Sequence, residues 1–140
     1  CRPLENYKIH FYRIIFRYFR DTCFIALEEG RVAGFVLAFL SQASDETLFL
    51  WQIGVRPDMQ GKGVGGRLLD EVEKKAREKG AGRVELTIAP DNAPSQRLFE
   101  KNGYSIISHK EKATVTVEGK DAARDYYGPG AHFILYEKAT

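Results

Sequence analysis

The 140-residue sequence has little cysteine and no long apolar run. Its two cysteines are Cys1 and Cys23, and Cys23 lies among apolar residues, where a buried thiol behaves as a small hydrophobe. We expect no signal peptide, and no apolar run of the sequence approaches the roughly 18 residues that a membrane span needs. These absences favour a cytoplasmic protein that does not act at a membrane.

An excess of charge of one sign is also absent, because 21 Lys and Arg residues face 19 Asp and Glu residues, a net charge of +2. Nucleic-acid binding needs many clustered basic residues, so we expect no nucleic-acid partner, and we expect no metal site either. The length and a hydrophobic content of 44% predict one compact domain with a single core.

Hydrophobic periodicity and turn residues divide the chain into helices and strands. Helices are predicted at 5–20, 64–79 and 92–102, and strands at 22–27, 32–40, 48–55, 83–88, 104–108 and 133–137, with a brief strand at 114–117. Trp51 and Gln52 are consecutive in a predicted strand, so their side chains should face opposite sides of the sheet. The polar stretch before the last strand is expected to be mobile. This order predicts an α/β fold, a mixed sheet with helices on its faces.

A glycine-rich segment, Gln60 to Arg67, joins a predicted strand to a predicted helix and contains four glycines. Glycine lets the backbone approach a ligand closely, and the N–H groups at a helix N-terminus carry partial positive charge. Lys62 and Arg67 add full positive charges. The segment therefore predicts a binding site for phosphate groups.

Glycine spacing alone leaves several phosphate ligands open. A nucleotide-binding P-loop needs Ser or Thr directly after Gly-Lys, whereas Gly63 follows Lys62. The dinucleotide pattern Gly-x-Gly-x-x-Gly is met by Gly61, Gly63 and Gly66. That pattern belongs after a first strand, however, and only Glu85 lies where a ribose-binding acid is needed. A dinucleotide site therefore fits the order of elements poorly.

Two segments together resemble the GNAT superfamily of acyl-CoA-dependent N-acetyltransferases. The first is that family's Gln/Arg-x-x-Gly-x-Gly/Ala turn, met here by Gln60, Gly63 and Gly65. The second is an Asn near a helix start, followed by Leu-Tyr/Phe and then by Gly-Phe/Tyr. It is met here by Asn92, Leu98, Phe99, Gly103 and Tyr104. The resemblance spans about residues 22–138. It implies the GNAT fold, a mostly antiparallel sheet flanked by helices, with acetyl-CoA as co-substrate.

The same resemblance implies which residues hold the cofactor. The backbone at the end of the third strand would pair with the pantetheine arm, and the N–H groups of the turn would hold the pyrophosphate. The cofactor-binding residues implied in this way are Ile53, Gly54, Val55, Gln60, Gly61, Lys62, Gly63, Val64, Gly65, Gly66, Arg67, Asn92, Ser95 and Phe99.

Short segments at 3–5, 21–23, 51–52 and 90–93 are similar to diaminobutyrate acetyltransferases. The similarity implies a small amine or amino acid as acceptor, with Glu5 as negative partner of its ammonium group. Substrate contacts are expected from Glu5, Trp51 and Tyr126. That family has Asp where this chain has Glu5, and the segment Tyr126 to Gly130 is similar to other GNAT enzymes. GNAT folds open with a strand and a helix, and we expect the single domain over 1–140 to lack them.

Amine acetylation requires two proton transfers. The amine, with a pKa of about 10.4 when lysine-like, must lose a proton before it attacks, and the leaving thiolate can gain one. A backbone N–H near Val55 would stabilise the oxyanion. Many GNAT enzymes have a Tyr acid where Phe99 stands, so we assign catalytic roles to Tyr127 and Glu5. Further candidates that stay open are Tyr104, Tyr126, Asp45, Glu46, His132 and a water chain.

The sequence thus predicts an N-acetyltransferase that moves an acetyl group from acetyl-CoA to a primary amine of a small molecule. Three alternatives remain. One is a protein N-terminal or lysine acetyltransferase, and another is a catalytically silent acetyl-CoA-binding regulator, which the Phe99 departure favours. The third is a module that binds a different phosphate ligand. A homodimer is left open.

Overall fold

The computed structural model describes residues 8–140, so the predictions made on Cys1 and Glu5 lie outside the described residues. The described residues divide into two compact units, 8–84 with Thr140, and 85–139. The fold is mixed α/β with mostly antiparallel strand pairs, as predicted. Within residues 8–140, no helix is both long enough and apolar enough to cross a membrane.

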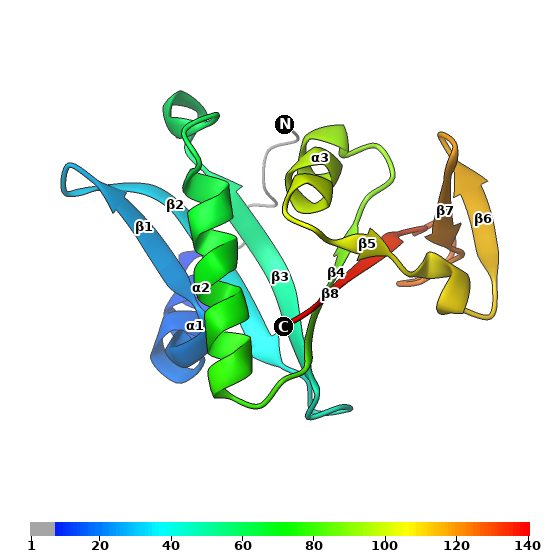
Figure 1. Cartoon of the computed structure of the whole chain (residues 1–140), viewed down its shortest axis with the longest axis horizontal. Helices are drawn as coiled ribbons and strands as arrows, with labels where there is room; N and C mark the ends of the chain where they lie inside the picture. The colour runs from blue at the N-terminus through cyan, green and yellow to red at the C-terminus, as the bar shows by residue number, and fades with distance from the viewer. Residues whose placement is uncertain (1–7) are drawn as a thin grey trace. The chain divides into compact units, whose positions relative to one another are not determined.

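The first unit is an antiparallel meander with a helix before it and a helix after it (Figure 1). Its elements are α1 (Ile9–Tyr18), β1 (Phe24–Glu28), β2 (Arg31–Leu40), β3 (Thr47–Val55) and α2 (Val64–Glu78). The predicted hairpin is confirmed: β1 pairs with β2, and its turn places Glu29 at φ 51° and Gly30 at φ 72°. Such positive angles suit the tight turns of hairpins.

The two helices of the first unit cover opposite faces of the meander (Figure 1). On the α2 face, a Cβ at Gly34 would lie 3.2 Å from both Leu68 and Val64 and 2.7 Å from the Gly54 carbonyl oxygen. This close approach requires glycine in β2. On the other face, Ile15 of α1 packs with Cys23, confirming the buried thiol.

A bulge in β3 overturns one prediction. Leu37 pairs with Gln52 but Ala38 pairs with Leu50, which leaves Trp51 as an extra residue in the ladder. A bulge sets two residues against one and interrupts the alternation of side chains. Trp51 therefore packs on the α1 face, and Gln52 also reaches α1. The prediction that the two side chains face opposite sides is wrong.

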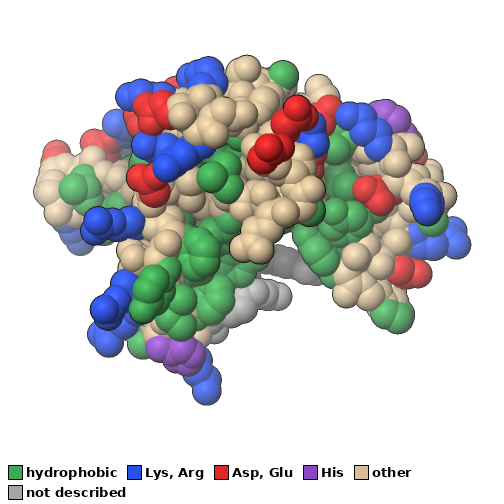
Figure 2. All heavy atoms as spheres, turned by 90° about the horizontal axis from the view of Figure 1, so that it is seen from below, with side chains coloured by type: hydrophobic (Ala, Val, Ile, Leu, Met, Phe, Trp, Pro, Cys, Tyr) green, Lys and Arg blue, Asp and Glu red, His purple; other side chains and the backbone are tan. Residues whose placement is uncertain are grey.

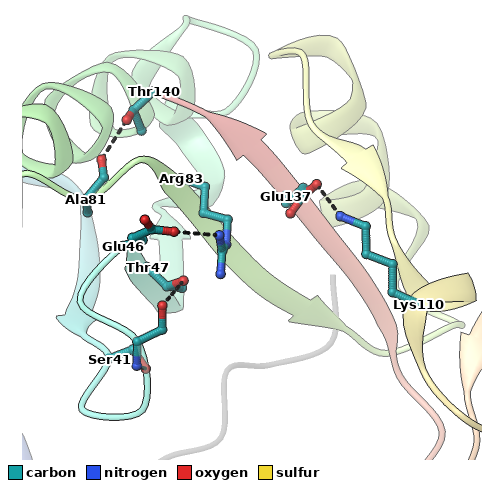
Figure 3. Close-up of polar contacts among 9 residues, drawn as sticks. Ser41, Glu46, Thr47, Ala81, Arg83, Lys110, Glu137 and Thr140 are labelled. Carbon is teal, nitrogen blue, oxygen red and sulfur yellow. Dashed lines mark hydrogen bonds and ion pairs between the residues drawn. The ribbon is translucent and has the colours of Figure 1, made fainter.

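The start of β4 (Arg83–Ile88) is anchored in the first unit. Arg83 donates its backbone N–H to the Glu46 carbonyl at 3.1 Å, and its side chain lies 3.6 Å from the Glu46 carboxylate (Figure 3). Thr140 donates its hydroxyl to the Ala81 carbonyl at 2.7 Å. These contacts tie the loop before β3 and the end of the chain to the segment that leads into β4.

The second unit contains the rest of β4, one α-helix and a short 3-10 helix at Ser108–Lys110. Its further elements are α3 (Ala93–Lys101), β5 (Ser105–Ile106), β6 (Thr114–Val117), β7 (Lys120–Ala123) and β8 (Ile134–Ala139). Strand β8 lies between β4 and β5, and β5 pairs with it antiparallel. An ion pair between Lys110 and Glu137, at 2.7 Å, fastens the segment after β5 to β8 (Figure 3).

The polar stretch before β8 holds a separate two-stranded hairpin. The brief strand predicted at 114–117 is confirmed as β6, whereas its partner β7 was not predicted. Lys120 and Asp121 are poor strand formers, but Ala122 and Ala123 are buried and supply the apolar contact that the sequence pattern did not reveal. The mobility expected for this stretch stays a prediction.

Candidate functional site

The segment between β3 and α2 has the conformation of a ligand-binding turn. Gly61 and Gly63 adopt φ values of 74° and 79°, and Gly63 is the residue directly before α2. Side-chain-bearing residues rarely adopt this left-handed region. A Cβ built at either position would meet no atom within 4 Å beyond the neighbouring residues. Glycine is therefore required here for conformation, while the space beside the turn is open.

Backbone donors gather at this turn. Across the described residues, the N–H groups of residues 61–66 donate to no backbone carbonyl, and Arg67 is the first to do so, to Gly63 at 3.1 Å. The first turn of α2 contains no acidic residue, and no side chain caps it. The helix dipole and free N–H groups together favour an anion at this place.

Two side chains brace the turn. Gln60 donates its Nε2 to the Val55 carbonyl at 3.2 Å, which links the turn to the end of β3. Arg67 forms an ion pair with Glu28 at the end of β1. The hydrogen bond from Arg67 lowers the pKa of Glu28 below its ordinary value, and Lys62 lowers it further. Positive charge thus surrounds the turn, but one cation is already paired.

The end of β3 supplies the other residues expected near the cofactor in the first unit. Ile53, Gly54 and Val55 pair in register with Val36, Phe35 and Gly34 of β2. The sequence predicted that these residues lie near the turn, and they do, because β3 leads into the turn within a few residues. It gave no signal that Glu28, from another strand, would pair with Arg67.

In the second unit, the residues predicted to line the cofactor have contacts within the fold. The Asn92 Oδ1 accepts a hydrogen bond from the Ser95 N–H at 3.3 Å and so caps α3. Phe99 is 2% exposed and packs edge to face against Tyr104, with ring centroids 5.1 Å apart. In the structure, therefore, Asn92 caps α3 and Phe99 is a buried aromatic residue of the same helix. Their contact with a cofactor stays a prediction.

The tyrosine pair of the second unit is partly exposed. Tyr126 and Tyr127 meet edge to face at 4.8 Å, and Tyr127 also packs on Phe133 at 4.9 Å. The Tyr127 hydroxyl lies 3.1 Å from the Thr87 hydroxyl. Burial and the neighbouring Tyr127 raise the pKa of Tyr126. Both phenols thus lie in one aromatic cluster with Phe133, held to β4 through Thr87.

Two of the other candidate bases, His132 and Glu46, have structural partners. The His132 Nδ1 accepts a hydrogen bond from the Asp125 N–H at 3.0 Å, which leaves its Nε2 for other contacts. Glu46 faces Arg83, as described above. Within residues 8–140, no group of three or more His, Cys, Asp or Glu side chains could hold a metal ion.

Charge is mixed over the surface drawn in Figure 2. Lys and Arg side chains lie among Asp and Glu side chains on this face, with hydrophobic side chains between them. Interspersed charges of both signs produce no strong field of one sign. Charged residues of the protein act as local partners elsewhere in the fold too, as Arg67 does with Glu28.

Comparisons with known proteins agree with the geometry of the turn. Residues 1–104 match the family described as "Acetyltransferase (GNAT) family". The chain is 37% identical over 98 residues to the L-2,4-diaminobutyric acid acetyltransferase of Shouchella clausii (strain KSM-K16), covering 70% of this chain and 55% of the relative. It is 39% identical over 90 residues to the enzyme of the same name from Halalkalibacterium halodurans, covering 64% and 48%. The chain thus spans about half the length of these relatives.

Solved structures share the fold. The diaminobutyrate acetyltransferase EctA from Paenibacillus lautus, in complex with L-2,4-diaminobutyric acid and coenzyme A, aligns with a TM-score of 0.71 at 25% identity, covering 96% of this chain and 79% of that one. Ard1 from Thermoplasma volcanium aligns with a TM-score of 0.76 at 20% identity, covering 99% and 83%, a likeness of fold alone. The family match covers most of the chain and includes the turn from Gln60 to Arg67, so this chain belongs to the GNAT acetyltransferase family.

Proposed function

We propose that this chain transfers an acetyl group from acetyl-CoA to a primary amine of a small molecule, with an amino acid such as 2,4-diaminobutyrate as the favoured acceptor. The turn before α2 carries the proposal, because its left-handed glycines and donor-rich N–H groups suit a pyrophosphate. The diaminobutyrate acetyltransferases among the relatives support the choice of acceptor. Protein N-terminal or lysine acetylation is the alternative.

The proposed reaction needs one bond made and one broken. The neutral amine attacks the thioester carbon, which forms the C–N bond and a tetrahedral oxyanion. The nitrogen then loses one proton and the C–S bond breaks, which gives the amide, the CoA thiolate and that proton. The proton lost by the ammonium group passes to a base, and the thiolate can take a proton from an acid. We propose that a backbone N–H near Val55 donates a hydrogen bond to the oxyanion and so stabilises it.

We assign the acid role to Tyr127 and the ammonium-binding and base role to Glu5, and substrate contacts to Trp51 and Tyr126. Tyr127 is 58% exposed, which supports a contact between this residue and a ligand. We also propose that the protein works in the cytoplasm, because Cys23 is a free thiol. Homodimerisation is an accompanying hypothesis that size-exclusion chromatography with light scattering would decide.

Gly63→Val tests the cofactor site. A β-branched residue is strained at this φ, and its side chain would cover the N–H groups, so acetyl-CoA affinity by calorimetry should fall by about 100-fold or more. Gly30→Val is the matched control, because Gly30 has a similar φ of 72° and equally open surroundings in the hairpin turn. It should lose comparable stability and keep its affinity. Unchanged binding in Gly63→Val would refute the placement.

Thermal shifts with acetyl-CoA, CoA, ATP and NAD, together with a turnover assay, separate the function classes. The proposal expects stabilisation by acetyl-CoA and CoA and release of free thiol when an amine is added. Stabilisation by acetyl-CoA without turnover on any amine would favour the silent regulator. Stabilisation by ATP or NAD alone would favour a different phosphate-binding module.

A further inference from the structure

The bulge in β3 places two consecutive side chains on one face of the meander. Trp51 packs against Phe11 of α1, with ring centroids 5.2 Å apart, and tilts against Phe39 of β2 at 6.2 Å. Gln52, opposite Leu37, faces the same way. Bulges are common beside active sites because they redirect a side chain. Here the redirected residue is an aromatic, and it lies next to an amide.

Gln52 lies on the same face of the meander as a hydrophobic cluster. On this face, the hydrophobic cluster consists of Ile15, Cys23, Leu37, Phe11, Tyr12, Phe16, Phe35, Phe39 and Trp51. The Tyr12 hydroxyl lies 3.5 Å from the Gln52 Oε1, so a phenol and an amide meet within this cluster. Both side chains are half-buried, which leaves each accessible from one side.

The orientation of Gln52 determines what it can recognise. Its Oε1 is turned toward the Tyr12 hydroxyl, and its Nε2 therefore presents donors to a ligand. Donors pair with a carboxylate or carbonyl and not with an ammonium group. The helix α1, with the sequence IHFYRIIFRY, contains basic residues and no Asp or Glu, so the helix beside this pair places no negative charge near it.

The position in the chain connects this pair to the reaction. Gln52 directly precedes Ile53, where the pantetheine arm of the cofactor is expected to begin its contact with β3. An acceptor held at Gln52 would thus be close in the chain to the expected thioester site.

Resting on the proposed function, we propose that the Gln52 Nε2 donates to the carboxylate of an amino-acid acceptor, with the Tyr12 hydroxyl orienting the Gln52 amide and Trp51 packing on the carbon chain of the acceptor. The pair is a specificity determinant: it selects an amine that carries a carboxylate over a plain diamine. Hydrogen bonds to a charged group are stronger than those between neutral groups, and a half-buried apolar setting strengthens them further.

Two acceptors that differ by one group test this proposal. 2,4-Diaminobutyrate and 1,3-diaminopropane share the three-carbon diamine chain, and only the first has a carboxylate. The wild-type enzyme should prefer the first in kcat/KM by about 10-fold or more, as loss of a hydrogen bond to a charged group implies. Gln52→Glu keeps the size of the side chain but repels a carboxylate, so this preference should fall at least about 10-fold. Tyr12→Phe should lower it about 3- to 10-fold.

Matched controls separate recognition from general damage. Gln42→Glu adds the same charge in the exposed loop before β3, and Tyr18→Phe removes a phenol from the exposed side of the same helix. Both should leave the preference within about twofold of wild type. A preference unchanged in Gln52→Glu, or equal wild-type rates on the two acceptors, would overturn the proposal.

Calorimetry with the same two amines and CoA-loaded protein tests the carboxylate site separately from the proposed acetyltransferase activity. If no amine is acetylated but diaminobutyrate binds the wild type and not Gln52→Glu, the proposed activity is wrong and the carboxylate site stands. If acetylation occurs and the substitution changes neither binding nor preference, the activity stands and the carboxylate site is wrong.

Discussion

The two GNAT-like segments of the chain differ in what their groups already contact. In the first unit, the turn before α2 leaves its N–H groups without backbone acceptors across the described residues, and a Cβ at Gly61 or Gly63 would face open space. In the second unit, the Asn92 side chain caps α3 and Phe99 is buried against Tyr104. The first segment leaves backbone donors open, whereas the second stabilises its own helix.

This difference changes how a motif should be interpreted. Residues of both segments match one family pattern, yet a substitution in the turn should act mainly on binding, and a substitution in the second segment should act mainly on stability. The free energy of unfolding and the affinity for acetyl-CoA, measured on the same variants, therefore test whether the two segments differ in this way.

Phe99→Ala should give the largest stability effect. Phe99 is buried at 2% exposure in the second unit, and truncating a buried Phe typically costs about 3–5 kcal/mol through lost burial and the cavity left behind. Denaturant unfolding would measure the loss, and Phe99→Leu should recover most of it. A Phe99→Ala protein of normal stability that had lost acetyl-CoA binding would show that the ring serves the ligand and not the fold.

Gly34→Ala should destabilise the first unit by about 1–3 kcal/mol, as overpacking does. A Cβ there would lie 2.7 Å from the Gly54 carbonyl oxygen, closer than packed atoms allow. This glycine differs from Gly63, whose requirement is conformational. Gly82→Ala is the control, because a Cβ at Gly82 meets no atom within 4 Å, and its stability should change by less than about 1 kcal/mol. Equal effects at the two positions would contradict the close approach.

The sequence predicted the fold where local patterns determine structure. The hairpin at Glu29 and Gly30, the helix at Val64 and the strand at Arg83 follow from turn residues and periodicity, and the structure has them within a few residues. Family resemblance supplied the GNAT architecture as a whole. Strand β7 was missed because its strand character comes from the burial of Ala122 and Ala123, which is a tertiary effect.

The candidate site was only partly predictable, for a related reason. The turn residues are adjacent in sequence, so their grouping needed no tertiary information. The bulge at Trp51 depends on how β3 pairs with β2, and periodicity alone assigns such a residue to the wrong face. The contacts between Gln52 and Tyr12 and between Arg67 and Glu28 join separate elements, and no local pattern indicates them.

Asn92→Ala should lower the stability of the second unit by about 1 kcal/mol, the usual cost of removing an N-cap. The lost contact is the hydrogen bond from the Ser95 N–H to the Asn92 Oδ1. Asn92→Ser should restore most of this stability, since Ser caps about equally well. If Ser restores stability but acetyl-CoA affinity stays low, the amide of Asn92 has a second role at the cofactor, and the contrast between the two segments is weakened.

Glu28→Gln should have the smallest effect on cofactor affinity. It tests whether the ion pair with Glu28 reduces the ability of Arg67 to bind an anion. The Glu28 carboxylate occupies Arg67, so a cofactor phosphate must compete for that cation. Because the pair is exposed, its contribution is small and screened by salt, and CoA affinity should rise by no more than about fivefold in the variant.

The pH dependence of this effect has a defined sign. Contact with Arg67 lowers the pKa of Glu28 below its ordinary value of 4.5, so the ion pair is complete above that value and is lost as pH falls through the lowered pKa. The affinity difference between wild type and Glu28→Gln should therefore be constant at neutral pH and disappear in acid. Glu71→Gln, on the exposed side of α2, is the charge-matched control. Calorimetric titration with CoA at low and high salt measures both variants; weaker binding in Glu28→Gln would mean that Glu28 orients Arg67 toward the phosphate instead of competing with it.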